Sequence, residues 1–148
     1  MSTGSSDKPR EGYVVRRILV VEDDAEMRAL LADVLRENGN EVVEASNGAE
    51  ALIRLRAEPF AAIVLDKNMP GLSGLDLLPG MRTLCPDTPV IMITAFGDIA
   101  TYVDAVEKGA SAYLFKPFRM EELLQALRHA LSSARRDVPA IVTSGGAG

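Results

Sequence analysis

The sequence of 148 residues predicts an α/β fold: one domain built on a doubly wound, parallel, five-stranded sheet. Two observations predict it. Short runs of branched apolar residues alternate five times with segments whose apolar residues recur at helical spacing, which is typical of βα units. Polar residues follow most of these runs directly, as expected where ligands bind beyond the carboxyl ends of parallel strands.

Each expected strand is a run of four to six mostly apolar residues, many of them β-branched. Largely continuous apolar runs are typical of parallel strands, because helices cover both faces of the sheet. In chain order the strands are expected at 18–21, 42–45, 60–65, 90–93 and 112–115.

Each expected helix follows a strand. In the first helix Leu31 and Leu35 belong to an apolar stripe, and Gly39 ends it, as Gly109 ends the fourth. Pro79 lies inside the third helix, where its missing N–H should kink the helix or shift its start. In chain order the helices are expected at 26–38, 49–57, 75–84, 99–108 and 120–134.

Polar segments flank this pattern. Residues 1–15 are expected to form a disordered N-terminal tail and residues 135–148 a flexible C-terminal tail, with the domain over 16–134. About a dozen residues after the last helix cannot form an output domain, which needs at least ~50.

The composition excludes several classes of function. A net charge of −5 gives no basic surface for nucleic acid. No apolar stretch is long enough to span a bilayer, and no signal peptide precedes the first strand. Cys85 is the single cysteine, so no internal disulfide is possible. We therefore expect a cytoplasmic protein without nucleic-acid or membrane partners.

Acidic, hydroxyl and basic side chains stand at the ends of four expected strands. They are Glu22, Asp23 and Asp24 after the first, Asp66 after the third, Thr94 after the fourth, and Lys116 with Pro117 after the fifth. The carboxyl ends of parallel strands share one edge of the sheet, so these groups should meet there. The pattern predicts a metal site beside an aspartate that can accept a phosphoryl group.

The chemistry explains why these residue types are needed. A carboxylate and a phosphorylated donor repel each other, by roughly 4 kcal/mol at 4 Å and an effective dielectric of 20. Mg²⁺ (or Mn²⁺) bridging carboxylates and phosphoryl oxygens removes this obstacle. Asp23 and Asp66 are the expected direct ligands, with Glu22 acting through water. Lys116 supplies a positive charge and Thr94 a hydroxyl donor for the phosphoryl oxygens.

Asp24 has two interpretations. Aspartate is a favoured N-cap, and Asp24 directly precedes the first expected helix. It also adjoins the acidic pair, where it could act as a further carboxylate ligand. We expect the N-cap, with metal binding as the alternative.

Together these motifs resemble the receiver domain of two-component response regulators, over about residues 17–133. The segments TAFGD (94–98) and YLFKPF (113–118) are most similar to the nitrogen-regulator (NtrC) subgroup. The resemblance implies a flavodoxin-like receiver fold in which a histidine kinase or phosphotransfer protein phosphorylates Asp66. It also implies that the backbone carbonyl of Asn68 completes the metal ligands and that the Lys116–Pro117 bond is cis.

The resemblance further implies a conformational switch. Thr94 would move toward phosphorylated Asp66, and the ring of Tyr113 would move into the vacated space. The surface of the fourth helix, fifth strand and fifth helix would then bind a downstream protein or a second copy of the chain. We expect no enzymatic activity beyond the receiver's own autophosphorylation and autodephosphorylation.

Other interpretations remain. We expect a stand-alone receiver; the alternative is the excised receiver of a larger transcription regulator or hybrid kinase. A phosphatase with an aspartate nucleophile is more remote, because Asn68 stands where such enzymes carry a second, proton-shuttling aspartate. A flavin carrier would need phosphate-binding donors where Glu22 to Asp24 stand. A phosphorylation-independent receiver is disfavoured because every expected site residue is present.

Overall fold

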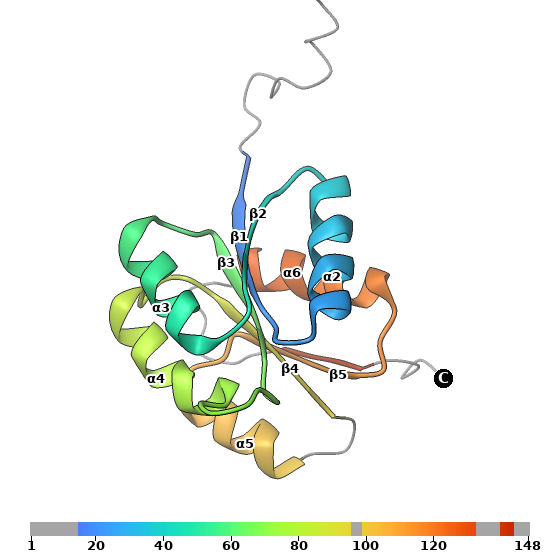
Figure 1. The fold of residues 1–148 in the computed structure, drawn as a ribbon. Coiled ribbons are helices and arrows are strands. Elements are labelled where there is room, and N and C mark those ends of the chain that lie inside the picture. The colour runs from blue at the N-terminus through green and yellow to red at the C-terminus, as the bar shows by residue number, and fades with distance from the viewer. Residues whose placement is uncertain (1–14, 96–98, 133–139, 144–148) are drawn as a thin grey trace, which may run out of the picture.

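The computed structural model describes residues 15–95, 99–132 and 140–143, and shows one parallel sheet between two layers of helices (Figure 1). All neighbouring strands run parallel, in the order β2-β1-β3-β4-β5-β6. The strands are β1 (Arg17–Val21), β2 (Glu41–Ala45), β3 (Ala62–Asp66), β4 (Val90–Ala95), β5 (Ala112–Lys116) and β6 (Ala140–Thr143). The predicted α/β class and parallel sheet are confirmed.

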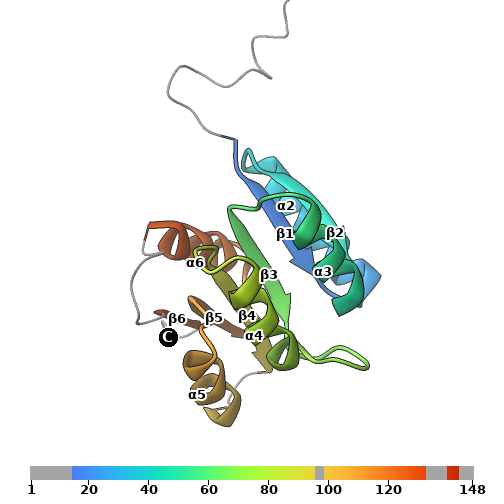
Figure 2. The same ribbon diagram turned by 90° about the vertical axis from the view of Figure 1, so that its left-hand side faces the viewer.

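The helices cover both faces of the sheet. On one side lie α2 (Ala25–Glu37) and α6 (Met120–Ser132); on the other lie α3 (Gly48–Ala57), α4 (Gly74–Leu84) and α5 (Ile99–Glu107) (Figure 2). Each strand divides its side chains between the two layers. In β1, for example, Ile18 and Val20 pack in the core on the α2 side, whereas Leu19 and Val21 pack on the α3 side. The continuous apolar runs of the sequence therefore reflect strands buried on both faces.

Capping residues define where three helices begin. The carboxylate of Asp24 accepts hydrogen bonds from the backbone N–H groups of Glu26 and Met27, so Asp24 is the N-cap of α2. Asn47 caps α3, and Ser73 forms a capping box with Asp76 at the start of α4.

Pro79 was predicted either to kink the third helix or to shift its start, and the structure tests the second effect. Helix α4 begins at Gly74 and continues through Pro79, so the proline does not shift the start of the helix. Gly39 and Gly109, the predicted ends of α2 and α5, both have positive φ, at 89° and 100°.

The sheet has a sixth strand that we did not predict. Strand β6 pairs in parallel with β5, with Thr143 opposite Phe115, so the predicted flexible tail at 135–148 is wrong for residues 140–143. The run Ala-Ile-Val-Thr has a strand-like composition, and its backbone covers an edge of β5 that would otherwise lack partners. A short run between a proline and a glycine-rich end gave too weak a signal. The predicted tail at 1–14, and the rest of the C-terminal one, lie outside the described residues.

Strand boundaries differ slightly from the prediction, and the difference concerns the site. Strands β3, β4 and β5 extend far enough to include Asp66, Thr94 and Lys116. These polar side chains therefore belong to the last residues of strands rather than to the loops after them. Backbone pairing thus fixes their positions more precisely than a loop would.

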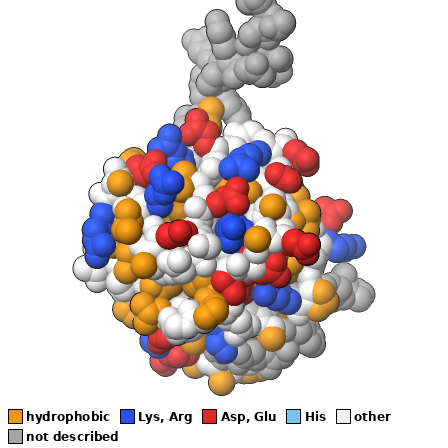
Figure 3. All heavy atoms as spheres, in the orientation of Figure 1, with side chains coloured by type: hydrophobic (Ala, Val, Ile, Leu, Met, Phe, Trp, Pro, Cys, Tyr) orange, Lys and Arg blue, Asp and Glu red, His pale blue; other side chains and the backbone are white. Residues whose placement is uncertain are grey.

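The surface is mixed in charge. On the face shown in Figure 3, acidic and basic side chains are interspersed, and neither sign dominates. No helix within the described part of the chain is both long enough and apolar enough to cross a bilayer.

Candidate metal and phosphoryl site

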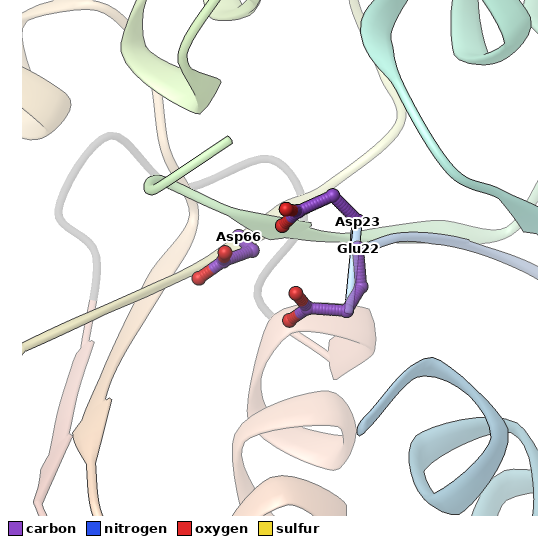
Figure 4. A group of neighbouring side chains, drawn as sticks. All are labelled: Glu22, Asp23 and Asp66. Atoms are coloured by element: carbon purple, nitrogen blue, oxygen red, sulfur yellow. The ribbon is translucent and has the colours of Figure 1, made fainter. Parts of the chain in front are cut away.

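Three carboxylates meet at the carboxyl end of the sheet. Glu22 and Asp23 follow β1, and Asp66 ends the neighbouring strand β3 (Figure 4). One oxygen from each carboxylate lies within 4.8 Å of the other two. Glu22 and Asp66 are buried, at 2% and 1% exposed, whereas Asp23 is exposed. The group therefore has two buried acids behind one that faces solvent.

Strand pairing brings these acids together. Val21 lies opposite Leu65 in the β1–β3 register, so Glu22 and Asp66 occupy the next positions along both strands. On the other side, the N–H of Glu22 donates to the carbonyl of Ala45 at 3.1 Å, so pairing with β2 continues past the end of β1.

The environment of Glu22 favours its protonated form. The pKa of Glu22 is raised to about 7, chiefly by burial; a hydrogen bond from the N–H of Asp24 opposes this rise, and the nearby charge of Asp66 adds to it. That bond uses Oε2; Oε1 is buried without a hydrogen-bond partner among the described residues. An acceptor left in this state marks a position where a ligand or ordered water belongs.

Asp66 pairs with Lys116. The ammonium nitrogen lies 3.1 Å from Oδ1 of Asp66, and the lysine side chain is about one-third exposed. Burial raises the pKa of Asp66, and the hydrogen bond and charge of Lys116 oppose that shift without cancelling it. The lysine thus holds one positive charge directly beside the carboxylate.

Thr94 lies on the strand next to Asp66. Ile93 pairs with Asp66 in the β3–β4 register, and Thr94 is the following residue. Its side chain is fully buried, and Oγ1 has no hydrogen-bond partner in the described part of the chain. The hydroxyl therefore retains its donor for a group arriving at this edge of the sheet.

Tyr113, the expected switch aromatic, is buried in β5 at 1% exposed. Its ring contacts Tyr102 on α5 and Phe115 edge to face, with centroid distances of 5.3 Å and 5.1 Å. Tyr113 therefore links β5 to α5 through ring packing.

The remaining predicted residues have separate roles. The Lys116–Pro117 peptide bond is cis, as the resemblance implied. Both recorded side-chain bonds of Asp24 cap α2, which supports the cap interpretation over metal binding. Asn68 is exposed in the loop after β3, two residues from Asp66.

Gly74 supports the site in a way that the sequence analysis did not detect. A Cβ atom at this position would lie only 2.6 Å from the carbonyl oxygen of Asp66, and the N–H of Gly74 donates to the carbonyl of Lys67. The start of α4 therefore packs directly on the backbone of the proposed phosphoacceptor. The sequence signal was a glycine directly after the cap Ser73, at the first position of the helix, where only a close approach requires glycine.

A mostly apolar cavity of about 460 Å³ lies beside Lys116. It lies between the start of α2, the end of β4 and the segment before α6. Its lining residues are Met27, Ala95, Lys116, Pro117, Phe118 and Met120.

The donor set fits a hard divalent cation. Mg²⁺ prefers oxygen ligands and binds through one or two carboxylates together with water and phosphate oxygens. Glu22, Asp23 and Asp66 supply carboxylates at suitable spacing, and the unpartnered Oε1 of Glu22 can accept from a metal-bound water.

Comparison with known proteins is consistent with this geometry. Residues 18–128 match the family model described as response regulator receiver domain. The chain belongs to the response regulator receiver family. Receivers of this family interact with kinases or phosphotransfer proteins.

Three relatives illustrate the range of this similarity. The receiver is 41% identical over 116 residues to the response regulator protein FleR of Pseudomonas aeruginosa, covering 78% of this chain and 24% of FleR. It is 33% identical over 120 residues to the chemotaxis protein CheY of Bacillus subtilis, covering 80% of this chain and 100% of CheY. The crystal structure of the NtrX receiver domain from Brucella abortus superposes with a TM-score of 0.75 at 34% identity, covering 78% of this chain and 98% of the NtrX chain.

The relatives differ in total length. The receiver spans 24% of FleR and 44–52% of several other curated relatives, but all of CheY. The shared part is the receiver in each case.

Proposed function

We propose that this receiver accepts a phosphoryl group on Asp66 from a histidine kinase or a phosphotransfer protein, in a reaction that requires Mg²⁺ or Mn²⁺. One observation carries the proposal: Asp66 lies within 4.8 Å of two further acids and 3.1 Å from Lys116 at the carboxyl end of the sheet.

In the proposed reaction a carboxylate oxygen of Asp66 attacks the phosphorus of a phosphohistidine. The P–N bond breaks, its electron pair returns to the imidazole nitrogen, and that nitrogen takes up a proton. The ammonium of Lys116, now paired with Asp66, binds a phosphoryl oxygen. The Thr94 hydroxyl donates to another phosphoryl oxygen.

Asp23 and Asp66 would hold the metal directly, Glu22 through water, and Asn68 through its backbone carbonyl. A bound divalent cation would supply the positive charge that offsets repulsion between the carboxylates and the phosphoryl group. Lys116 alone cannot do this, because one ammonium faces three carboxylates.

The proposal includes a switch through Thr94 and Tyr113. A hydrogen bond from Thr94 to the phosphoryl group exists in the phosphorylated state only, and such a charge-assisted bond contributes roughly 1.5–3 kcal/mol. Tyr113 would relay the change to α5 through its contact with Tyr102. On α5 the side chains of Ile99 and Val103 are 62% and 50% exposed. This surface is proposed to bind a downstream protein or a second receiver.

The apolar cavity beside Lys116 supports a protein phosphodonor. Met27, Phe118 and Met120 would give the donor's apolar side chains a contact next to the reacting carboxylate. The proposal places this exchange in the cytoplasm.

We propose further that the receiver acts as a stand-alone protein, as its full coverage of CheY supports. The chain matches only 24% of FleR, which favours the alternative, a receiver belonging to a longer regulator. The likeness to NtrX supports assignment to the nitrogen-regulator subgroup. A gene whose reading frame continues past Gly148 would contradict the stand-alone proposal.

The central test is intact-mass measurement after incubation with acetyl phosphate and Mg²⁺. The parent protein should gain one phosphoryl mass, and Asp66→Asn should gain none. Asp33→Asn, which removes an exposed acid on the outside of α2, should behave as the parent does. A phosphoryl group that survives Asp66→Asn would refute the assignment. The receiver should also show no turnover of an ordinary phosphomonoester, since it is proposed not to be an enzyme.

A further inference from the structure

Arg28 contacts the backbone that carries two of the three acids. On α2, one turn after the N-cap, it donates from Nη1 to the carbonyl oxygen of Glu22 at 2.8 Å. Its side chain is only 20% exposed. That carbonyl belongs to the peptide group joining Glu22 to Asp23. The guanidinium therefore holds the peptide plane from which both carboxylates project.

The other side of the guanidinium is fixed as well. Nε of Arg28 lies 3.4 Å from Oε1 of Glu44 on β2, and Oε2 of Glu44 lies 3.4 Å from Nη1 of Arg36. Arg28 thus connects β2 to the end of β1. A planar guanidinium between two partners has little freedom to rotate.

The Glu22–Asp23 segment is consequently held at several points. The N–H of Glu22 donates to Ala45, its carbonyl accepts from Arg28, and the N–H of Asp24 donates to the Glu22 carboxylate. Of these bonds, only the one from Arg28 comes from a side chain outside the loop. A substitution at Arg28 therefore removes this hydrogen bond without changing any of the three acidic residues.

We propose that Arg28 is a positioning residue, which holds Glu22 and Asp23 in the geometry required for a divalent cation. This inference rests on the metal site of the proposed function. Its physical basis is preorganisation: groups behind a metal ligand fix its direction, and their loss typically weakens metal binding 10- to 100-fold.

Electrostatics alone predicts the opposite effect. Arg28 is a cation near a site for a dication, so its removal should strengthen metal binding if only charge mattered. Glu44 pairs with the guanidinium and reduces that repulsion. The sign of the change in affinity therefore distinguishes positioning from simple charge.

The experiment is calorimetric titration of the full chain with Mg²⁺ at constant ionic strength. Arg28→Gln should weaken Mg²⁺ binding about tenfold. Arg28→Lys keeps the charge but replaces the planar guanidinium with a single nitrogen on a flexible stem, and should fall between that variant and the parent. Arg36→Gln is the control: Arg36 pairs with the same glutamate, but it donates to the carbonyl of Val42 rather than to that of Glu22, so the variant should stay within about twofold of the parent.

Amide exchange of the metal-free variants tests whether the effect is local. In Arg28→Gln, faster exchange at the amides of Glu22 and Asp24, with β3 and β4 unchanged, supports positioning. Faster exchange throughout the sheet would overturn it in favour of a merely structural role. Mg²⁺ binding by Arg28→Gln as tight as in the parent, or tighter, would also overturn it. A parent that binds no Mg²⁺ would refute the metal site itself, and this inference with it.

Discussion

The two ends of the sheet differ in how far their polar side chains are paired within the chain. At the carboxyl end, Oε1 of Glu22 and Oγ1 of Thr94 are buried without hydrogen-bond partners among the described residues, and the pKa values of Glu22 and Asp66 are raised. At the amino end, Arg17 forms ion pairs with Glu41 on β2 and with Glu58 before β3.

Arg82 on α4 is a second side chain with several partners at the amino end of the sheet. It donates to the backbone carbonyls of Cys85, Pro86 and Thr88, in the segment that leads into the strand. The arginines at the amino end thus satisfy carboxylates and backbone carbonyls within the chain, although Nε of Arg82 is itself buried without a hydrogen-bond partner among the described residues. The carboxyl end leaves buried acceptors and a buried hydroxyl for a ligand, which is typical of functional sites.

The largest expected effect is at the amino end. Arg82→Ala should lower the free energy of unfolding by about 3 kcal/mol, because it leaves carbonyls at the end of α4 without their donor and removes packing against Gly109. Urea unfolding at neutral pH measures it. Arg56→Ala, which removes an exposed arginine on α3, should change the value by less than about 0.5 kcal/mol. A loss below about 1 kcal/mol for Arg82→Ala would contradict the stabilising role.

A second, intermediate effect concerns pH at the carboxyl end. In the unfolded chain Glu22 has its ordinary pKa of 4.5, and in the folded protein its pKa is about 7. The folded state therefore retains a proton that the unfolded state has lost. The stabilising contribution of protonated Glu22 to the free energy of unfolding is complete below pH 4.5 and is lost as the pH rises to about 7. Metal-free protein should lose about 2 kcal/mol of stability over that range, and Asp66 acts with the same sign.

Thermal unfolding between pH 4.5 and 7 without metal, at constant ionic strength, measures this loss. Asp66→Asn removes the charge that helps raise the pKa of Glu22, so its stability should depend less on pH. In the parent protein, saturating Mg²⁺ at pH 7 should restore the stability lost over this pH range, because Mg²⁺ binds the ionised carboxylates of the folded state. Equal pH dependence in the parent and Asp66→Asn would contradict the coupling.

The smallest effect is expected at Arg17. Its side chain is 41% exposed, so its ion pairs with Glu41 and Glu58 are screened by solvent. Arg17→Ala should therefore lower the free energy of unfolding in urea by less than either of the two effects above. A cost similar to that of Arg82→Ala would show that the two arginines at this end do not differ as their burial suggests.

Most of the fold could be predicted from local patterns. Continuous apolar runs predict strands buried on both faces, and the polar residues after them predict which edge carries the site. Asp66, Thr94 and Lys116 are recognisable because each lies in the last two residues of a strand of a parallel sheet, so position along the chain implies position in space.

The supporting contacts could not be predicted in this way. Arg28 acts on Glu22 and Glu44, and Arg82 packs against Gly109, across separations at which neither periodicity nor capping rules apply. Such contacts depend on how helices settle on the sheet. Strand β6 was missed for a different reason: a four-residue run has too little pattern to distinguish a strand from a polar tail.

Strand β6 also determines where anything joined to this chain begins. Since β6 runs parallel to β5 with Thr143 opposite Phe115, the chain reaches the carboxyl end of the sheet at Thr143, beside the strand that carries Lys116. Neighbouring strands are only about 4.8 Å apart. A fluorescent reporter attached directly after Thr143 would start near the phosphoryl site, whereas one attached before β1 would start at the opposite end of the sheet (Figure 2). The C-terminal attachment point is therefore the better place from which to observe the site.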